Sequence, residues 1–115
     1  MHELSIAMSI IDIACEEAHR LAAQRVRAVH LKLGQLSGVV RRALESAYEM
    51  AVEQSEISGA RLVIEEVPVA IYCRRCDGER PARSIQEMCC ATCGEPSYEV
   101  VRGRDLEVVR MEIDP

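Results

Sequence analysis

The chain has 115 residues, with 14 basic and 19 acidic side chains, and its net charge is −5. This balance argues against a general nucleic-acid-binding protein, because such proteins carry a basic balance or a basic stripe. No apolar run approaches the roughly 18–20 residues that span a bilayer. Glu3 and Asp12 interrupt the N-terminal segment, which lacks the features of a signal peptide. We therefore expect a cytoplasmic protein with no membrane partner.

Residues 4–22 are predicted to form a helix with apolar side chains on two sides. Such a helix is buried twice, either by a second neighbour within the chain or by a partner or dimer contact. The expected core stripe contains Leu4, Ala7, Met8, Ile11, Cys15, Ala18 and Ala22. The second stripe contains Ile6, Ile10 and Ile13, which are candidates for a partner surface.

Residues 26–33 are predicted to form a half-buried strand, because apolar and polar side chains alternate in Val29, His30, Leu31, Lys32 and Leu33. The segment Gly34-Gln35-Leu36-Ser37-Gly38 is predicted to be a turn. It is not a phosphate-binding P-loop, because the Lys-Ser/Thr pair of that motif is missing.

A second amphipathic helix is predicted at 39–55 and a second strand at 61–67, ended by Pro68. After Gly103 the alternating pattern of a strand returns. The expected fold is therefore α+β, a small three-stranded sheet covered by two helices, with an inserted zinc-ribbon-like module. The parent domain would take residues 1–68 plus 99–115, and the module residues 69–98.

The module contains two Cys-x2-Cys pairs, Cys73 with Cys76 and Cys90 with Cys93, separated by thirteen residues. In the reducing cytoplasm such pairs predict a metal site rather than disulfides, and this spacing is typical of structural zinc. Four thiolates leave no open position for water, so the zinc is not expected to be catalytic. Cys89 is expected to pack as a small apolar side chain, although it lies close enough in sequence to compete as a ligand.

The chain begins Met1-His2-Glu3. An α-amino group, the amide nitrogens of His2 and Glu3, and the His2 imidazole together offer a nitrogen-rich chelate suited to Ni(II) or Cu(II). Taken alone, a histidine at position 2 is more often a solvated side chain, and Glu3 alone favours the helix dipole.

Several segments of the chain resemble the HypA/HybF family of hydrogenase nickel-insertion proteins. They are Met1-His2-Glu3-Leu4-Ser5, Gly34-Gln35-Leu36-Ser37, Glu65-Glu66-Val67-Pro68 and the two cysteine pairs with Gly94. The resemblance implies a nickel metallochaperone of [NiFe]-hydrogenase maturation, with His2 and the nitrogen atoms of Met1 and Glu3 as nickel ligands. It implies structural zinc on Cys73, Cys76, Cys90 and Cys93.

The same resemblance implies three kinds of partner: the nickel-handling GTPase HypB, the hydrogenase large-subunit precursor and, for some members, urease maturation factors. A homodimer stays open, because an inserted module permits domain swapping. Two positions depart from the family pattern. Ala91 stands where many members have proline, and Ser97 and Tyr98 stand where some have a histidine that assists nickel.

Two other functions compete with this interpretation. A zinc-ribbon interaction module of transcription or translation would fit the cysteines, but the acidic charge and the scarcity of aromatic residues argue against base stacking. An enzyme is not expected, because the three histidines are scattered and no catalytic triad or nucleotide motif is present.

Overall fold

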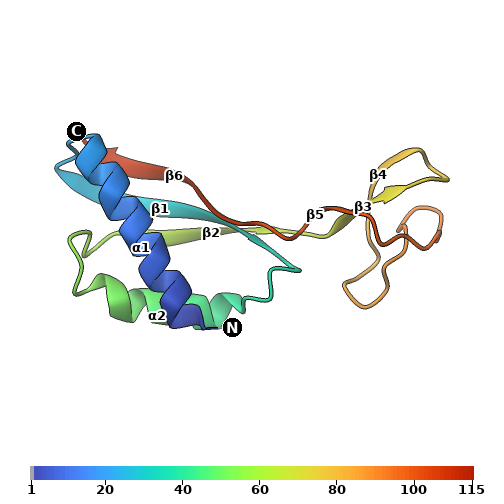
Figure 1. The fold of residues 1–115 in the computed structure, drawn as a ribbon, viewed down its shortest axis with the longest axis horizontal. Helices are drawn as coiled ribbons and strands as arrows, with labels where there is room; N and C mark the ends of the chain where they lie inside the picture. Colours follow the sequence, from blue (N-terminus) through green and yellow to red (C-terminus); the bar gives the residue numbers. More distant parts are fainter. Residues whose placement is uncertain (1) are drawn as a thin grey trace. The chain divides into compact units, whose positions relative to one another are not determined.

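The computed structural model describes residues 2–115, which form two helices and two small sheets (Figure 1). The sheets have the strand orders β2-β1-β6 and β4-β3-β5. In chain order the elements are α1 (Glu3–Arg20), β1 (Arg25–Gly34), α2 (Arg41–Val52), β2 (Arg61–Val67), β3 (Ala70–Cys73), β4 (Gly78–Pro81), β5 (Val100–Arg102) and β6 (Leu106–Asp114). The expected α+β fold is confirmed, including a last strand that rejoins the first two.

The chain divides into two compact units. The first contains the chain up to Lys32 together with Val39–Glu65 and Glu107–Pro115. The second contains Leu33–Gly38 and Glu66–Leu106. The module expected at 69–98 lies inside the second unit, which also takes in the segments at 33–38 and 99–106. These added segments are strand ends and turns without cysteine. The module was predicted from its cysteine-rich composition, so the prediction left them out.

The first unit is built on α1, α2 and the larger sheet, whose central strand is β1. The helices pack against each other and bury Ala14, Leu44 and Tyr48 among others. The predicted alternation holds in the second half of β1, where Leu31 and Leu33 are buried. It shifts by one residue earlier in the strand, because Ala28 and Val29 are both fully buried.

The buried face of α1 differs from the predicted core stripe. Its buried residues are Ala7, Ile10, Ile11, Ala14 and Ala18. Leu4, Met8 and Ile13, in contrast, are about half exposed. The core predictions for Leu4, Met8 and Ala22 were therefore wrong, whereas Ile10 is buried within the chain and is not open to a partner. Both stripes are apolar, so helical periodicity alone could not choose between them. The buried face of the helix lies between the two stripes, where three alanines allow neighbouring elements to pack closely.

The second unit is a small antiparallel sheet beside an irregular segment. Strand β3 pairs with β4 from Ala70↔Pro81 to Cys73↔Gly78, and with β5 at Ala70↔Arg102. Its hydrophobic core cluster contains four buried residues, Val69, Ile71, Cys73 and Cys90, with partly buried side chains around them. Two of the four are predicted metal ligands, so the predicted metal site forms part of this core cluster.

We use the word neck for residues 34–36, 67–69 and 103–105 of the second unit, where three chain segments meet. The Gly34 N–H donates to the Asp105 carbonyl and the Leu36 N–H to the Gly103 carbonyl, both at 2.7 Å. A Cβ at Gly34 would come within 2.1 Å of the Gly103 oxygen. Glycine is therefore required at position 34 by close backbone approach.

Within the neck, Gln35 holds the short segment between β2 and β3. Its backbone N–H donates to the Val67 carbonyl at 3.0 Å, and its side-chain Oε1 accepts from the Val69 N–H at 3.0 Å. Gly103 has a φ of +114°, a conformation that L side chains rarely adopt. The segment Gly34-Gln35-Leu36-Ser37 thus has a structural role in the second unit.

Over residues 2–115, neither helix combines the length and the apolar character required for a transmembrane segment.

Candidate metal centre

Four cysteine side chains from two distant segments converge in the second unit. The sulfur atoms of Cys73, Cys76, Cys90 and Cys93 all lie within 4.8 Å of one another. The Cys73 and Cys93 sulfurs are 3.5 Å apart, and those of Cys76 and Cys90 are 3.9 Å apart. Separations of this size suit four thiolates around one tetrahedral ion with metal–sulfur bonds of about 2.3 Å. The structure therefore brings together the four residues selected from sequence.

Each cysteine pair folds into the same local turn. The Cys76 N–H donates to the Cys73 sulfur, and the Cys93 N–H donates to the Cys90 sulfur, each at 3.4 Å. The second turn ends at Gly94 with a φ of +80°, as the glycine predicts. The first turn reaches the same region at Asp77, with a φ of +53°. Aspartate tolerates this conformation better than most residues, and the Tyr72 hydroxyl donates to its carboxylate at 2.7 Å.

The surroundings of Cys76 and Cys90 shift the pKa values of these two thiols in opposite directions. Burial raises the pKa of the Cys76 thiol to about 12, helped by the neighbouring thiols. Burial acts in the same direction on Cys90, but the backbone N–H groups of Cys93 and Thr92 outweigh it and lower the pKa of that thiol to about 6. The Cys90 thiol therefore loses its proton more readily than the Cys76 thiol, and an ion that binds both sulfurs must displace the proton of Cys76.

The two remaining cysteines lie outside this cluster. Cys89 and Cys90 form isolated backbone β-bridges with different segments, Cys89 with Pro96 and Cys90 with Ala82. In extended chain, successive side chains point to opposite sides, so the Cys90 sulfur enters the cluster and the Cys89 sulfur does not. Cys15 lies on α1 in the first unit, where burial raises the pKa of its thiol.

The predicted N-terminal site is described from His2 onward, and Met1 lies outside the described residues. His2 is exposed and has extended backbone angles, φ −95° and ψ 90°. Its carbonyl accepts the first helical hydrogen bond, from the Ile6 N–H at 3.2 Å, while its imidazole makes no capping bond. Glu3 is the first residue of α1.

The other two histidines have carboxylate partners. His19 Nε2 lies 2.6 Å from Glu56 at the surface, and His30 Nε2 lies 2.6 Å from Glu112. His30 also has Nδ1 facing Arg110 at 3.5 Å. An arginine can only donate, so this arrangement assigns the proton of a neutral His30 to Nε2. Neither histidine joins the cysteine cluster.

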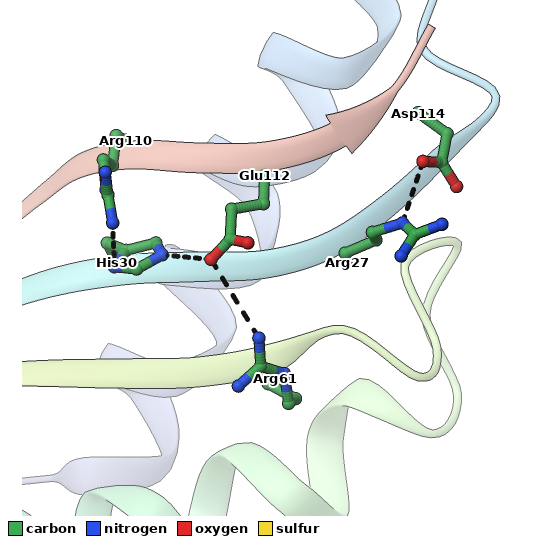
Figure 2. A network of polar contacts seen from close by, with 6 residues as sticks. All are labelled: Arg27, His30, Arg61, Arg110, Glu112 and Asp114. Carbon is green, nitrogen blue, oxygen red and sulfur yellow. Dashed lines mark hydrogen bonds and ion pairs between the residues drawn. The ribbon is translucent and has the colours of Figure 1, made fainter.

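Figure 2 shows that His30 belongs to a polar network across three strands, which sequence analysis did not identify. Glu112 of β6 bridges His30 of β1 and Arg61 of β2, the latter at 4.0 Å. The hydrogen bond from His30, and then the charges of His30, Arg61 and Arg110, lower the pKa of Glu112. The signal was present in the alternating charges of residues 110–114, but the strand pairing needed to interpret it was not.

Fold and cluster together define a small metal-binding α+β protein with a four-cysteine site. A family model described as "Hydrogenase/urease nickel incorporation, metallochaperone, hypA" matches residues 1–113. The chain therefore belongs to the HypA family.

Two curated relatives extend this match over nearly whole chains. The Hydrogenase maturation factor HypA of Chloroflexus aurantiacus is 42% identical over 112 residues, covering 97% of this chain and 98% of the relative. That of Geobacter metallireducens is 41% identical over 114 residues, covering 99% and 100%. The solution structure of the Ni metallochaperone HypA from Helicobacter pylori has a TM-score of 0.69 at 23% identity, covering 99% of this chain and 98% of that one. This last likeness is one of fold.

Proposed function

We propose that this chain is a nickel metallochaperone that binds Ni(II) at its N-terminus and delivers it during [NiFe]-hydrogenase maturation. The observation that carries the proposal is the exposed, extended His2 immediately before α1. Membership of a nickel-incorporation family supports it. The proposed ligands are the His2 imidazole, the Met1 amine and the backbone nitrogens of His2 and Glu3.

The start of a helix suits this kind of chelate. The first four N–H groups of a helix have no intrahelical acceptor, so the Glu3 amide can lose its proton without breaking a helical hydrogen bond. The His2 carbonyl, in contrast, is already used by Ile6 and can remain so. Two deprotonated amides also neutralise Ni²⁺, which removes the repulsion that a bare cation would experience at the positive end of the helix dipole.

We assign the four-cysteine cluster to structural Zn²⁺. Its two inner ligands, Cys73 and Cys90, are fully buried, and they are two of the four buried residues in the core cluster of the unit. A four-thiolate site has no open position for a substrate, which supports a structural role and a protein without catalytic activity of its own. A shallow terminal chelate can release its ion to a partner, whereas this buried cage cannot.

The proposed partners are the GTPase HypB and the hydrogenase large-subunit precursor, with urease maturation factors as further candidates, all in the cytoplasm. The structure changes which residues are candidates for docking. Ile10 is only 4% exposed, so it no longer belongs to the proposed surface, while Leu4 and Met8 are 51% and 54% exposed. They lie within the first two turns after His2, so a docked partner would reach the nickel.

The test is a calorimetric Ni(II) titration of the zinc-loaded protein, with a free Met1 amine confirmed by mass spectrometry. His2→Ala should lose about one nickel equivalent and keep its zinc. His19→Ala is the matched control, because His19 is also an exposed histidine on α1 and should bind nickel normally. Extension of the N-terminus by one glycine should weaken binding, since the amine leaves the chelate.

Binding of nickel should strengthen as pH rises, because the amine and both amides must lose protons. Equal binding by wild type and the His2→Ala variant would place the nickel elsewhere. Loss of zinc along with nickel in that variant would contradict two independent sites.

A further inference from the structure

Strand β6 lies at the open end of its sheet. In the order β2-β1-β6, only β1 flanks it among the described residues. Its nine residues present backbone groups along one side, and an exposed strand edge of this length is a template for pairing.

A hollow adjoins this edge, and most of the side chains that line it are apolar. It has a volume of about 310 Å³ and is lined by residues of β6, by Ile13 and Glu17 of α1, and by Leu21 just after that helix; Glu17 and Arg110 are its two charged lining residues. Val109 of β6 is 42% exposed, Ile13 of α1 is 50% exposed, and Leu21, which follows the end of α1, is 45% exposed. Met111 and Ile113 also line the hollow and are partly exposed. The apolar layer between α1 and the sheet therefore continues to the open edge, where further apolar side chains would bury it.

The sequence of β6 indicates that a second copy of the same strand pairs there, because its charged and apolar residues match those of an antiparallel copy of itself. Two copies with their helices on the same side of one continuous sheet must be related by a two-fold axis through a residue. With the axis at Met111, Val109 lies opposite Ile113 of the second copy, so both are on the apolar side. On the other side, Arg110 lies opposite Glu112 of the second copy, and the pair occurs twice.

Neighbouring positions of the axis do not fit. An axis at Arg110 would place two arginines opposite each other, and an axis at Glu112 would place two glutamates opposite each other. Like charges in directly opposite positions destabilise a sheet. An axis at Val109 would set Glu107 against Met111 on the apolar side. Of these registers, only the one centred on Met111 matches both charge and hydrophobicity.

We propose that two copies of this chain pair antiparallel through β6, centred on Met111, to form a continuous six-stranded sheet. The side chains of Val109, Met111 and Ile113 from both copies then fill the hollow beside α1. This inference does not depend on the nickel assignment. Ile13 is eleven residues after His2, about 16 Å along a helix at 1.5 Å per residue. Each copy therefore keeps its own N-terminal site.

The first experiment measures the dimer dissociation constant of zinc-loaded protein by sedimentation over a concentration series. Arg110→Glu should raise this constant about tenfold, because two opposite-charge pairs become like-charge pairs. The combined variant Arg110→Glu with Glu112→Arg should restore it, since the charges are exchanged but still opposite. Both variants disturb the contacts of His30 within the chain, so restoration would identify pairing between copies as the cause.

A second pair of variants tests the apolar side. Met111→Arg would place two positive charges next to the axis and should prevent dimerisation. Met50→Arg is the control, because Met50 is 72% exposed on α2 in a different part of the unit. Thermal unfolding of each variant shows whether the protomer remains folded.

The register itself can be tested with a short thiol-to-thiol crosslinker. Met111→Cys should give crosslinked dimers, because opposite residues have Cβ atoms about 5 Å apart. Val109→Cys alone should not, since its copies lie four residues apart along the strand, about 13 Å. A mixture of Val109→Cys and Ile113→Cys should crosslink. Protein without these substitutions reports the background from Cys15 and Cys89.

A protein that is monomeric at every concentration and shows no Met111→Cys crosslink would overturn the proposal. A dimer that is indifferent to Arg110→Glu and Met111→Arg would also overturn it, because the copies would then meet elsewhere. Protection of the β6 amides from hydrogen exchange only upon addition of a different protein would assign this edge to that protein instead.

Discussion

At the scale of single residues, the hydrogen bonds of a side chain can explain why a particular residue type stands at its position. Gln35 is the main example, because its amide oxygen and its own N–H bind two points of the short segment between β2 and β3. The resemblance to the family included this residue, but its sequence context gave no reason for glutamine. The reason is the N–H of Val69, a residue that is only 4% exposed and has no other acceptor in this arrangement of backbone.

Gln35→Ala should therefore destabilise the second unit by about 1–3 kcal/mol, the cost of leaving a buried N–H without an acceptor. Chemical unfolding monitored within that unit would measure the change. Gln86→Ala is the matched control, since Gln86 is exposed and should change stability by less than about 0.5 kcal/mol. Equal stability of both variants would contradict a structural role for the Gln35 side chain.

Tyr48 gives the first unit a defined response to alkali. Its hydroxyl donates to the Ala60 carbonyl at 3.0 Å, and burial, followed by the charge of Cys15, raises its pKa to about 12. The ordinary pKa of tyrosine in an unfolded chain is about 10. The unfolded state then loses its proton first, so this contribution to stability is complete below pH 10 and is lost as the pH rises toward 12.

Tyr48→Phe should cost about 1–2 kcal/mol at neutral pH, because the Ala60 carbonyl loses its donor. It should also flatten the decline of stability between pH 10 and 12. Denaturant unfolding at a series of pH values measures both effects. A decline of the same steepness in the variant would show that another group titrates in this range.

At the scale of elements, the predictions were right where the spacing of residues in the sequence pointed to a single local structure. The strand predicted at 61–67 is β2 to the residue, and the cysteine pairs fold into the expected turns. The helices are shorter than predicted, since α2 spans Arg41–Val52 rather than 39–55. The face of α1 could not be predicted, because both of its stripes are apolar and only the neighbouring helix and sheet select the buried one.

The corrected face of α1 yields a prediction about docking. Met8→Asp should abolish capture of the nickel-handling GTPase in a pull-down assay, because a charge would be placed on the exposed apolar surface beside His2. The variant should fold normally, since Met8 is 54% exposed. Met50→Asp, also at an exposed methionine, should leave capture intact. Unchanged capture by the Met8 variant would remove this surface from the proposal.

At the scale of the whole molecule, the two units differ in what holds them together. The first has a core of mainly aliphatic side chains from two helices and a sheet, whereas two of the four residues in the core cluster of the second are cysteines. The strand order and the neck could not be predicted in detail, because they depend on contacts between segments about 70 residues apart. The cysteine spacing alone was enough to predict that a metal site organises the module.

Removal of zinc by a chelator should therefore unfold the second unit and leave the first folded. Hydrogen exchange followed by mass spectrometry should show amides of Glu66–Leu106 exchanging about 100-fold faster, with little change in α1 and β1. Lower pH should favour zinc loss, because thiols such as Cys76 regain protons. Cys93→Ser should reproduce the effect and Cys89→Ser should not. Retained protection after complete zinc removal would contradict a structural metal.

The neck has a consequence for how this chain is connected. A Cβ at Gly103 would lie 2.9 Å from the Cα of Val69, so the chain leaves and re-enters at one place. Residues 70–102 thus form one long insertion, and the residues on either side of it, Val69 and Gly103, are in contact. The entropy of closing such a loop grows only slowly with its length. Changing the length of the segment between Val69 and Gly103 should therefore disturb the parent domain little. We expect that residues 70–102 can be replaced as a unit by another module whose ends lie equally close.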